Sequence, residues 1–263
     1  MIRLVVTDVD GTIVGNSQMN LNPEYYDVIR ALTEKGIQVV IASGRQYESI
    51  RKIMEPVQDL IWYIADSGAT IKTDKGFETT GEISHDILRR CITDLRNIPG
   101  MTYFLTTPEK SYTPEIDTPM YNSLTYDLHY PTEYVGNLDL VPDYPINKLT
   151  LFREADVEYY AYKYLSPKWE DKLHMAKSGE FWIDCLLPGI NKATALKVIM
   201  EHLGVDKDEV LATGDNQNDI EMVKLAGIGL AVDNAHLDLK AVADAVIPSY
   251  TEDGVLQEWK KLL

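Results

Sequence analysis

The stretch Asp8-Val9-Asp10-Gly11-Thr12 decides the fold of this chain. It directly follows the apolar run Ile-Arg-Leu-Val-Val of residues 2–6, which we interpret as a buried strand of a parallel sheet. A strand that ends at two carboxylates, a glycine and a threonine suits the carboxyl edge of an open α/β sheet, where ligands bind. Gly11 lets the backbone turn sharply and approach a ligand closely. Taken alone, the same stretch could equally be an Asp-Gly turn with capping aspartates.

Two other apolar strands end in similar polar residues. Residues 37–42 run into Ser43-Gly44-Arg45, and residues 209–213 run into Gly-Asp-Asn-Gln-Asn-Asp at 214–219. Between them, Asn191-Lys192 opens a predicted helix. If the three strands are parallel neighbours, their polar ends converge at one edge of the sheet. That edge would gather Asp8, Asp10, Thr12, Ser43, Lys192, Asp215 and Asp219.

Such a group of carboxylates needs a counter-charge, because like charges in contact raise one another's pKa. A bound divalent cation is the simplest remedy. Ligands that are all oxygen favour a hard ion, and we therefore predict Mg²⁺. Zinc is not expected, since the five His and two Cys residues are scattered without ligand spacing.

These motifs resemble the haloacid dehalogenase (HAD) superfamily of phosphotransferases. The resemblance is carried by the DxDGT stretch at 8–12, by Ser43 after its strand, by the isolated Lys192 and by the GDxxND stretch at 214–219. Residues 222–235 and 252–255 are similar to the Cof-type branch of that superfamily. Two positions depart from the branch. Ser67-Gly68 stands where the branch has Asn-Gly, and Ala193 stands where it has glycine.

The alternation of strand and helix patterns predicts an α/β fold, with a doubly wound parallel-sheet (Rossmann-like) core formed by residues 1–81 and 188–263. Residues 82–187 differ, being rich in Tyr, Pro and Thr. Helix candidates at 84–97 and 154–165 lie there among several short strand candidates. We therefore predict an inserted α+β domain. The resemblance implies that it is a cap of the α/β (C2B-like) kind, which governs substrate specificity.

The resemblance implies a Mg²⁺-dependent phosphatase that hydrolyses small phosphorylated metabolites such as sugar phosphates. Asp8 would be the nucleophile that forms an aspartyl-phosphate, since a free aspartate has a pKa of about 3.9 and is ionised at neutral pH. Asp10 would act as general acid and base, and Lys192 would offset charge on the transferring group. The implied phosphate-binding residues are Val9, Thr12, Ser43, Gly44, Arg45, Lys192 and Asn218. The implied metal-binding residues are Asp8, Asp10, Asp215, Asn216 and Asp219.

Each assignment has a structural alternative. Thr12 could cap a turn, Ser43 could be an ordinary helix N-cap, and Arg45 could be structural. At the level of the whole protein, a phosphomutase with the same motifs remains an alternative. A receiver-like signalling protein phosphorylated on Asp is another, although a receiver is far shorter and lacks the DxDGT order.

Composition fits an enzyme of small molecules. The chain has 263 residues, of which 45% are hydrophobic and 25% charged, as in ordinary globular proteins. The net charge of −16 argues against nucleic acid as a partner. Two cysteines give no disulfide framework, and we see neither a signal peptide nor an apolar run of membrane length. We expect a cytoplasmic monomer or homodimer without a membrane partner.

Overall fold

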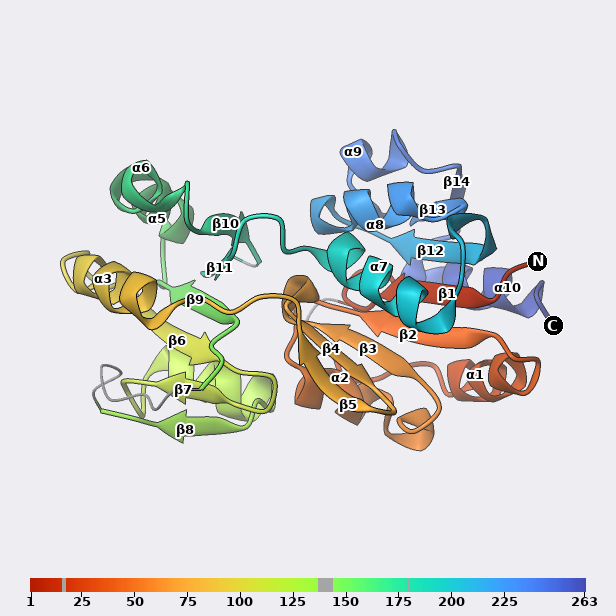
Figure 1. The fold of residues 1–263 in the computed structure, drawn as a ribbon, viewed down its shortest axis with the longest axis horizontal. Coiled ribbons are helices and arrows are strands. Elements are labelled where there is room, and N and C mark those ends of the chain that lie inside the picture. Colours follow the sequence, from red (N-terminus) through yellow and green to blue (C-terminus); the bar gives the residue numbers. More distant parts are fainter. Residues whose placement is uncertain (16–17, 137–143, 179) are drawn as a thin grey trace. The chain divides into compact units, whose positions relative to one another are not determined.

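The computed structural model describes residues 1–15, 18–136, 144–178 and 180–263. It divides the chain into two compact units (Figure 1). The first, here called the core unit, consists of Met1–Glu78 and Asn191–Leu263. The second, here called the insert unit, is Thr79–Ile190. The predicted insert of residues 82–187 lies within this second unit.

The core unit is built on an eight-stranded sheet with the strand order β14-β13-β12-β1-β2-β3-β4-β5. From β14 to β3 all neighbours are parallel, and β4 then pairs with β3 in the antiparallel sense. This arrangement confirms the predicted α/β core. The strands are β1 (Leu4–Asp8), β2 (Gln38–Ala42), β3 (Trp62–Ala65), β4 (Thr70–Thr73), β5 (Gly76–Thr79), β12 (Val210–Gly214), β13 (Ile228–Val232) and β14 (Ala245–Ile247).

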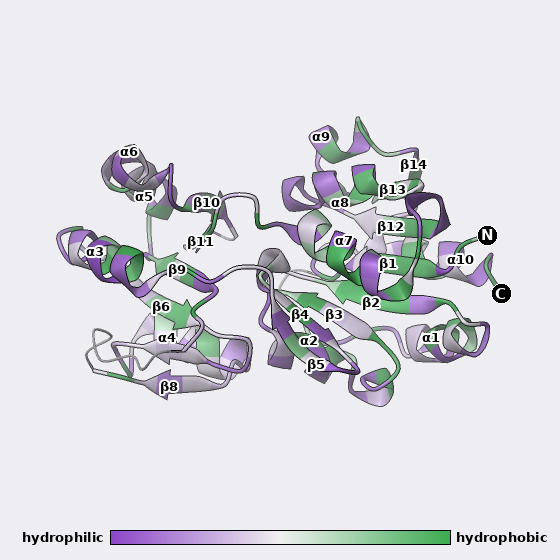
Figure 2. Cartoon of the chain, in the orientation of Figure 1, coloured by the Kyte–Doolittle hydropathy of each residue, from purple (hydrophilic) through white to green (hydrophobic). Residues whose placement is uncertain are grey.

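Helices pack on both faces of this sheet because successive side chains of a strand point to opposite faces. On β1, Val5 packs in one apolar cluster with α1, α2 and α10, while Leu4 and Val6 pack in another with α7 and α8. Figure 2 shows hydrophobic residues recurring along the strands and alternating with hydrophilic ones on the helices. The helices are α1 (Glu24–Glu34), α2 (Tyr47–Ile53), α7 (Lys192–Leu203), α8 (Ile220–Leu225), α9 (Leu237–Lys240) and α10 (Gly254–Lys260). Short 3₁₀ turns are η1 (Glu55–Val57), η2 (Asp66–Gly68), η5 (Lys207–Glu209), η6 (Gln217–Asp219) and η7 (Tyr250–Glu252).

The insert unit contains a six-stranded sheet of order β10-β11-β9-β6-β7-β8, in which only β7 and β8 pair in parallel among the described residues. Its larger apolar cluster includes residues of α3 and α5, and a smaller one includes residues of α4. The strands are β6 (Thr102–Thr106), β7 (Ser111–Thr113), β8 (Thr132–Tyr134), β9 (Lys148–Phe152), β10 (His174–Lys177) and β11 (Trp182–Leu186). The helical segments are α3 (His85–Leu95), α4 (Pro119–Asn122), η3 (Ser123–Asp127), α5 (Val157–Tyr164) and α6 (Ser166–Trp169).

Several short elements were not predicted from the sequence. Each of these elements is only three or four residues long, which is too short for apolar periodicity to be visible. They are the strands β4, β5, β7 and β8 and the helices α4 and α6. Helix α2 ends at Ile53, and the 3₁₀ turn η1, which contains Pro56, follows it.

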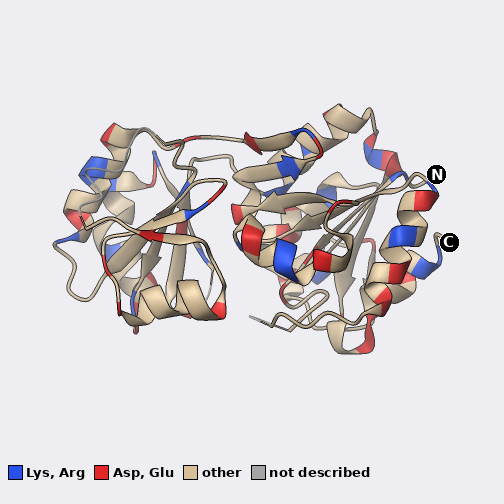
Figure 3. Cartoon of the chain, turned by 90° about the horizontal axis from the view of Figure 1, so that it is seen from below, with Lys and Arg blue, Asp and Glu red and all other residues tan. Residues whose placement is uncertain are grey.

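Charged residues recur over the helices and loops of both units, with Lys and Arg scattered among Asp and Glu (Figure 3). Within the described residues, we find no helix that combines the length and the apolar character needed to cross a membrane.

Candidate active site

The polar segments singled out in the sequence follow three adjacent parallel strands. Strand β1 lies between β12 and β2, with Thr7 level with Thr213 and Asp8 level with Ala42. The residues that follow β1, β2 and β12 therefore leave the sheet at the same edge. This is the convergence expected for the ligand-binding edge of an open α/β sheet.

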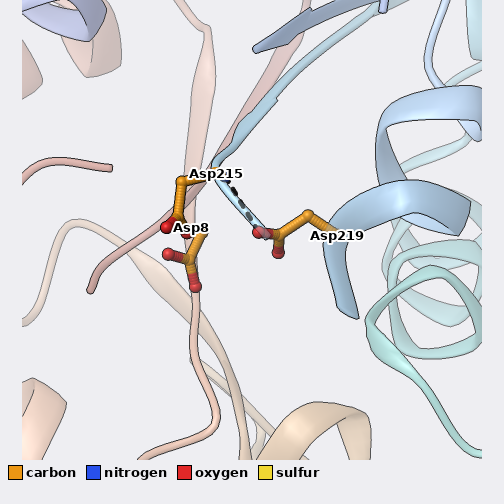
Figure 4. Close-up of side chains that lie close together, drawn as sticks. All are labelled: Asp8, Asp215 and Asp219. Carbon is orange, nitrogen blue, oxygen red and sulfur yellow. Dashed lines mark hydrogen bonds between the residues drawn. The ribbon is translucent and has the colours of Figure 1, made fainter. Parts of the chain in front are cut away.

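Three carboxylates meet at this edge. Each of Asp8, Asp215 and Asp219 has an oxygen within 4.8 Å of the others (Figure 4). Asp8 is 4% exposed and Asp219 is fully buried. The Thr12 hydroxyl lies 3.0 Å from Asp8 Oδ2 and 3.3 Å from Asp215 Oδ1, so a buried donor joins the first strand to the loop after β12.

Lys192 supplies the buried positive charge of the cluster. Its Nζ lies 2.5 Å from Asp8 Oδ1 and 2.6 Å from Asp219 Oδ1, and the side chain is only 1% exposed. Asn191 caps α7 by accepting a hydrogen bond from the Thr194 amide at 2.9 Å, which places Lys192 in the first helical turn. A cation is unfavourable at that end of a helix dipole, and the two carboxylates compensate for this.

Asp219 links Lys192 to the loop after β12. Its Oδ2 accepts hydrogen bonds from the amides of Asp215 and Asn216, both at 3.1 Å, while Oδ1 contacts Lys192. Both of its oxygens are thus engaged, as are those of Asp8, which contact Lys192 and Thr12. Sequence reasoning put Asp219 only among the metal-binding residues and overlooked its contact with Lys192.

The two asparagines of this loop do not join the cluster. Asn216 and Asn218 are exposed, and the Asn216 side chain accepts a hydrogen bond from the Gln217 amide at 2.8 Å. The family resemblance implied a phosphate-binding role for Asn218. Within the described residues, Lys192 forms its ion pairs with Asp8 and Asp219.

Gly11 is where the backbone comes closest to a carboxylate. Its φ is +81°, and a Cβ added there would lie 2.3 Å from Asp215 Oδ2. Val9, two residues before Gly11, is fully buried. Its carbonyl accepts hydrogen bonds from the amides of Thr12, Ile13 and Val14. This tight turn requires glycine both for its conformation and for the space that Asp215 occupies.

Asp10 and Arg45 form a bidentate ion pair that the sequence did not predict. Arg45 Nε lies 2.8 Å from Asp10 Oδ2 and Nη2 lies 2.6 Å from Oδ1. Arg45 is 5% exposed, and Nη2 also donates to the Gln18 carbonyl at 2.9 Å. Ser43, fully buried, accepts a hydrogen bond from the Arg45 amide at 3.1 Å. The guanidinium group of Arg45, which we expected to bind phosphate, is therefore already engaged by the Asp10 carboxylate.

The pKa values of the cluster reflect an excess of buried negative charge. Burial, together with repulsion from Asp219 and Asp215, raises the pKa of Asp8 well above its usual range, although Lys192 opposes the change. Burial and Asp219 raise the pKa of Asp215 to about 6. Burial alone would lower the pKa of Lys192, but Asp219 and Asp8 outweigh it and raise that pKa. Three carboxylates against one lysine form a site that would be stabilised by a bound cation.

Comparison with known proteins places this geometry in context. Residues 5–258 match the family model of haloacid dehalogenase-like hydrolases. The chain is 26% identical to the 5-amino-6-(5-phospho-D-ribitylamino)uracil phosphatase YbjI of Escherichia coli K12. The alignment covers 100% of this chain and 96% of YbjI. The chain is 28% identical to the phosphatase YcsE of Bacillus subtilis 168, which is named for the same activity. That alignment covers 97% of this chain and 93% of YcsE. A solved structure from Eubacterium rectale is 34% identical, with a TM-score of 0.92, over 100% of this chain and 99% of the other.

Proposed function

Since the chain belongs to the haloacid dehalogenase-like hydrolase family, we propose that it is a Mg²⁺-dependent phosphatase that acts on small phosphorylated metabolites through an aspartyl-phosphate on Asp8. The assignment to the phosphoric monoester hydrolases follows from its relatives, which are named phosphatases. The observation that carries the mechanism is the buried contact of Lys192 with Asp8, beside Thr12 and Asp215.

The residues at this edge fit a hard divalent cation. Asp8 and Asp215 offer only oxygen ligands, and burial together with the neighbouring carboxylates raises the pKa of both, so a bound cation would favour their ionised forms. When bound there, Mg²⁺ would screen the repulsion between the Asp8 carboxylate and an anionic phosphoryl group. We expect Asp219 to support the site through Lys192 and the amides of Asp215 and Asn216 rather than as a direct ligand.

In the proposed first step, an Asp8 carboxylate oxygen attacks phosphorus, and the bond between phosphorus and the ester oxygen breaks. Asp10 donates a proton to the departing oxygen. In the second step Asp10 takes a proton from a water molecule, the water oxygen attacks phosphorus, and the bond to Asp8 breaks to release inorganic phosphate. Asp10 is 30% exposed, so leaving group and water can reach it, and Arg45 fixes the orientation of its carboxylate.

The remaining groups would bind the phosphoryl oxygens. Lys192 carries the charge that offsets the transferring group, and the turn at Ser43 and Gly44 follows the neighbouring strand β2. The Thr12 hydroxyl, which contacts both Asp8 and Asp215, would hold these two carboxylates together. Selection of the leaving group by the insert unit stays a prediction.

The substrate class is a sugar or polyol monoester. Two relatives are named for a phosphoribitylaminouracil, a compound that carries a polyol phosphate.

Within the described residues, Cys91 and Cys185 are free thiols, in keeping with a reducing compartment such as the cytoplasm.

The test is a screen of the purified full chain with Mg²⁺ against phosphomonoesters that include this compound, hexose phosphates and phosphoglycolate. We expect release of inorganic phosphate that stops with EDTA and returns with Mg²⁺. Conversion of a hexose 1-phosphate into its 6-phosphate without phosphate release would instead identify a mutase. Turnover that persists without any metal would contradict the proposal.

A further inference from the structure

The turn after β3 has an unusual backbone next to the candidate active site. Asp66 and Ser67 both have positive φ, at 52° and 57°, and Gly68 follows at 105°. Glycine adopts this conformation readily, whereas Asp and Ser do so at a cost. Strained residues of this kind persist only where the surrounding structure holds them, and they concentrate at functional sites.

Hydrogen bonds fix this turn against the loop after β2. The Ser67 amide donates to the Ser43 carbonyl at 3.0 Å, and the Asp66 amide donates to the Arg45 carbonyl at 2.9 Å. The Thr70 hydroxyl donates to Asp66 Oδ2 at 3.0 Å. These contacts tie the turn to the segment that we expect to bind phosphate.

On its other side the turn packs against the beginning of α7. A Cβ on Gly68 would lie 2.2 Å from the Asn191 carbonyl oxygen and 2.9 Å from the Lys192 amide nitrogen. The turn is therefore wedged between two groups proposed to bind the phosphoryl oxygens, the Ser43–Gly44 backbone and Lys192.

Ser67 is the residue of this turn that solvent can reach. Asp66 and Gly68 are buried, whereas Ser67 is partly exposed. Its Oγ lies 3.3 Å from the position that a Cβ of Gly44 would occupy, so the hydroxyl sits beside the Gly44 backbone. Within the described parts of the chain, we find no hydrogen bond made by this hydroxyl. It can therefore donate one to a ligand.

We propose that Ser67 is a substrate-binding residue whose hydroxyl donates a hydrogen bond to the phosphoryl group, an inference that rests on the proposed phosphatase function. If the turn served only to reverse the chain, glycine at position 67 would form it with less strain. A serine there retains a donor at the edge of the site at the expense of stability, as is common at functional positions.

The test compares Ser67→Gly and Ser67→Ala with the matched control Asp156→Gly. Asp156 is an exposed residue of the insert unit with φ 52° and no side-chain capping bond, so glycine relieves a similar strain there without removing a capping hydrogen bond. We expect Ser67→Gly and Asp156→Gly both to raise the melting temperature. We expect only the two Ser67 variants to raise KM, by about tenfold, because a hydrogen bond to a charged group is lost.

Inhibition by inorganic phosphate separates binding from a structural role. The inhibition constant for phosphate should rise in parallel with KM in both Ser67 variants, while kcat changes less. Unchanged KM and phosphate inhibition in Ser67→Gly would overturn the inference, and so would a raised KM with unchanged phosphate inhibition. If the wild-type protein hydrolyses no phosphomonoester, the proposed function itself has failed, and the role of Ser67 fails with it.

Discussion

Replacing Gly11 by alanine tests the turn on which the acidic site depends. The φ of +81° is unfavourable for alanine, and its Cβ would lie 2.3 Å from Asp215 Oδ2. Gly36 provides a matched control in the same unit. Its φ is +77°, and a Cβ added there meets nothing within 4 Å.

The two variants separate strain from displacement. Each should lose about 1–2 kcal/mol of unfolding free energy, because alanine is forced into the left-handed region. An ordinary contact begins near 3.4 Å, so in Gly11→Ala the methyl and the Asp215 carboxylate must move apart by the difference from 2.3 Å, or 1.1 Å. A misplacement of about 1 Å at a reacting site can reduce the rate by about a hundredfold.

Urea denaturation would measure stability, and steady-state assays over a range of Mg²⁺ concentrations would measure kcat/KM and the metal requirement. We expect both variants to be similarly destabilised, with Gly36→Ala keeping wild-type activity. Gly11→Ala should lose most of its activity and need more Mg²⁺. Wild-type kcat/KM and Mg²⁺ dependence in Gly11→Ala would refute the role given to this close approach.

Three further predictions concern the charged cluster. Asp8→Asn should lower kcat by about a thousandfold or more without altering the circular dichroism spectrum, because it removes the nucleophile; substantial turnover would exclude Asp8 from that role. Lys192→Met should lower the free energy of unfolding by about 3–5 kcal/mol, since it leaves Asp8 and Asp219 without their buried cation. The exposed Lys197→Met on the same helix should have little effect, and equal losses in urea titrations would contradict this. Burial and Asp219 raise the pKa of Asp215 in the folded protein from 3.8 to about 6. Protonation of Asp215 therefore stabilises the fold, and this contribution is fully present at a pH below 3.8. That stability, at most about 3 kcal/mol and less with partial exposure, is lost as the pH rises through 6. Mg²⁺ should therefore raise the melting temperature more at about pH 8 than at about pH 5, and equal shifts would count against a cation between Asp8 and Asp215.

Some parts of the site could not be predicted from the sequence. The pairing of Asp10 with Arg45 depends on the path of the loop after β2, and the contact of Asp219 with Lys192 depends on how α7 and η6 approach each other. Neither carries a local signal, because each joins side chains that are far apart in the chain. The positive φ of Ser67 was equally unpredictable, since serine rarely adopts that conformation.

By itself, the sequence determined the class of fold and the edge of the sheet where polar residues gather. Apolar runs that end abruptly in Asp, Ser or Gly place those residues at strand termini, and parallel neighbours bring the termini together. Only the tertiary structure decided which charged side chains form ion pairs with one another. Lys192 pairs with Asp8 and Asp219, and Arg45 pairs with Asp10, because packing of α7 and of the loop after β2 sets distances of a few ångströms that sequence spacing does not encode.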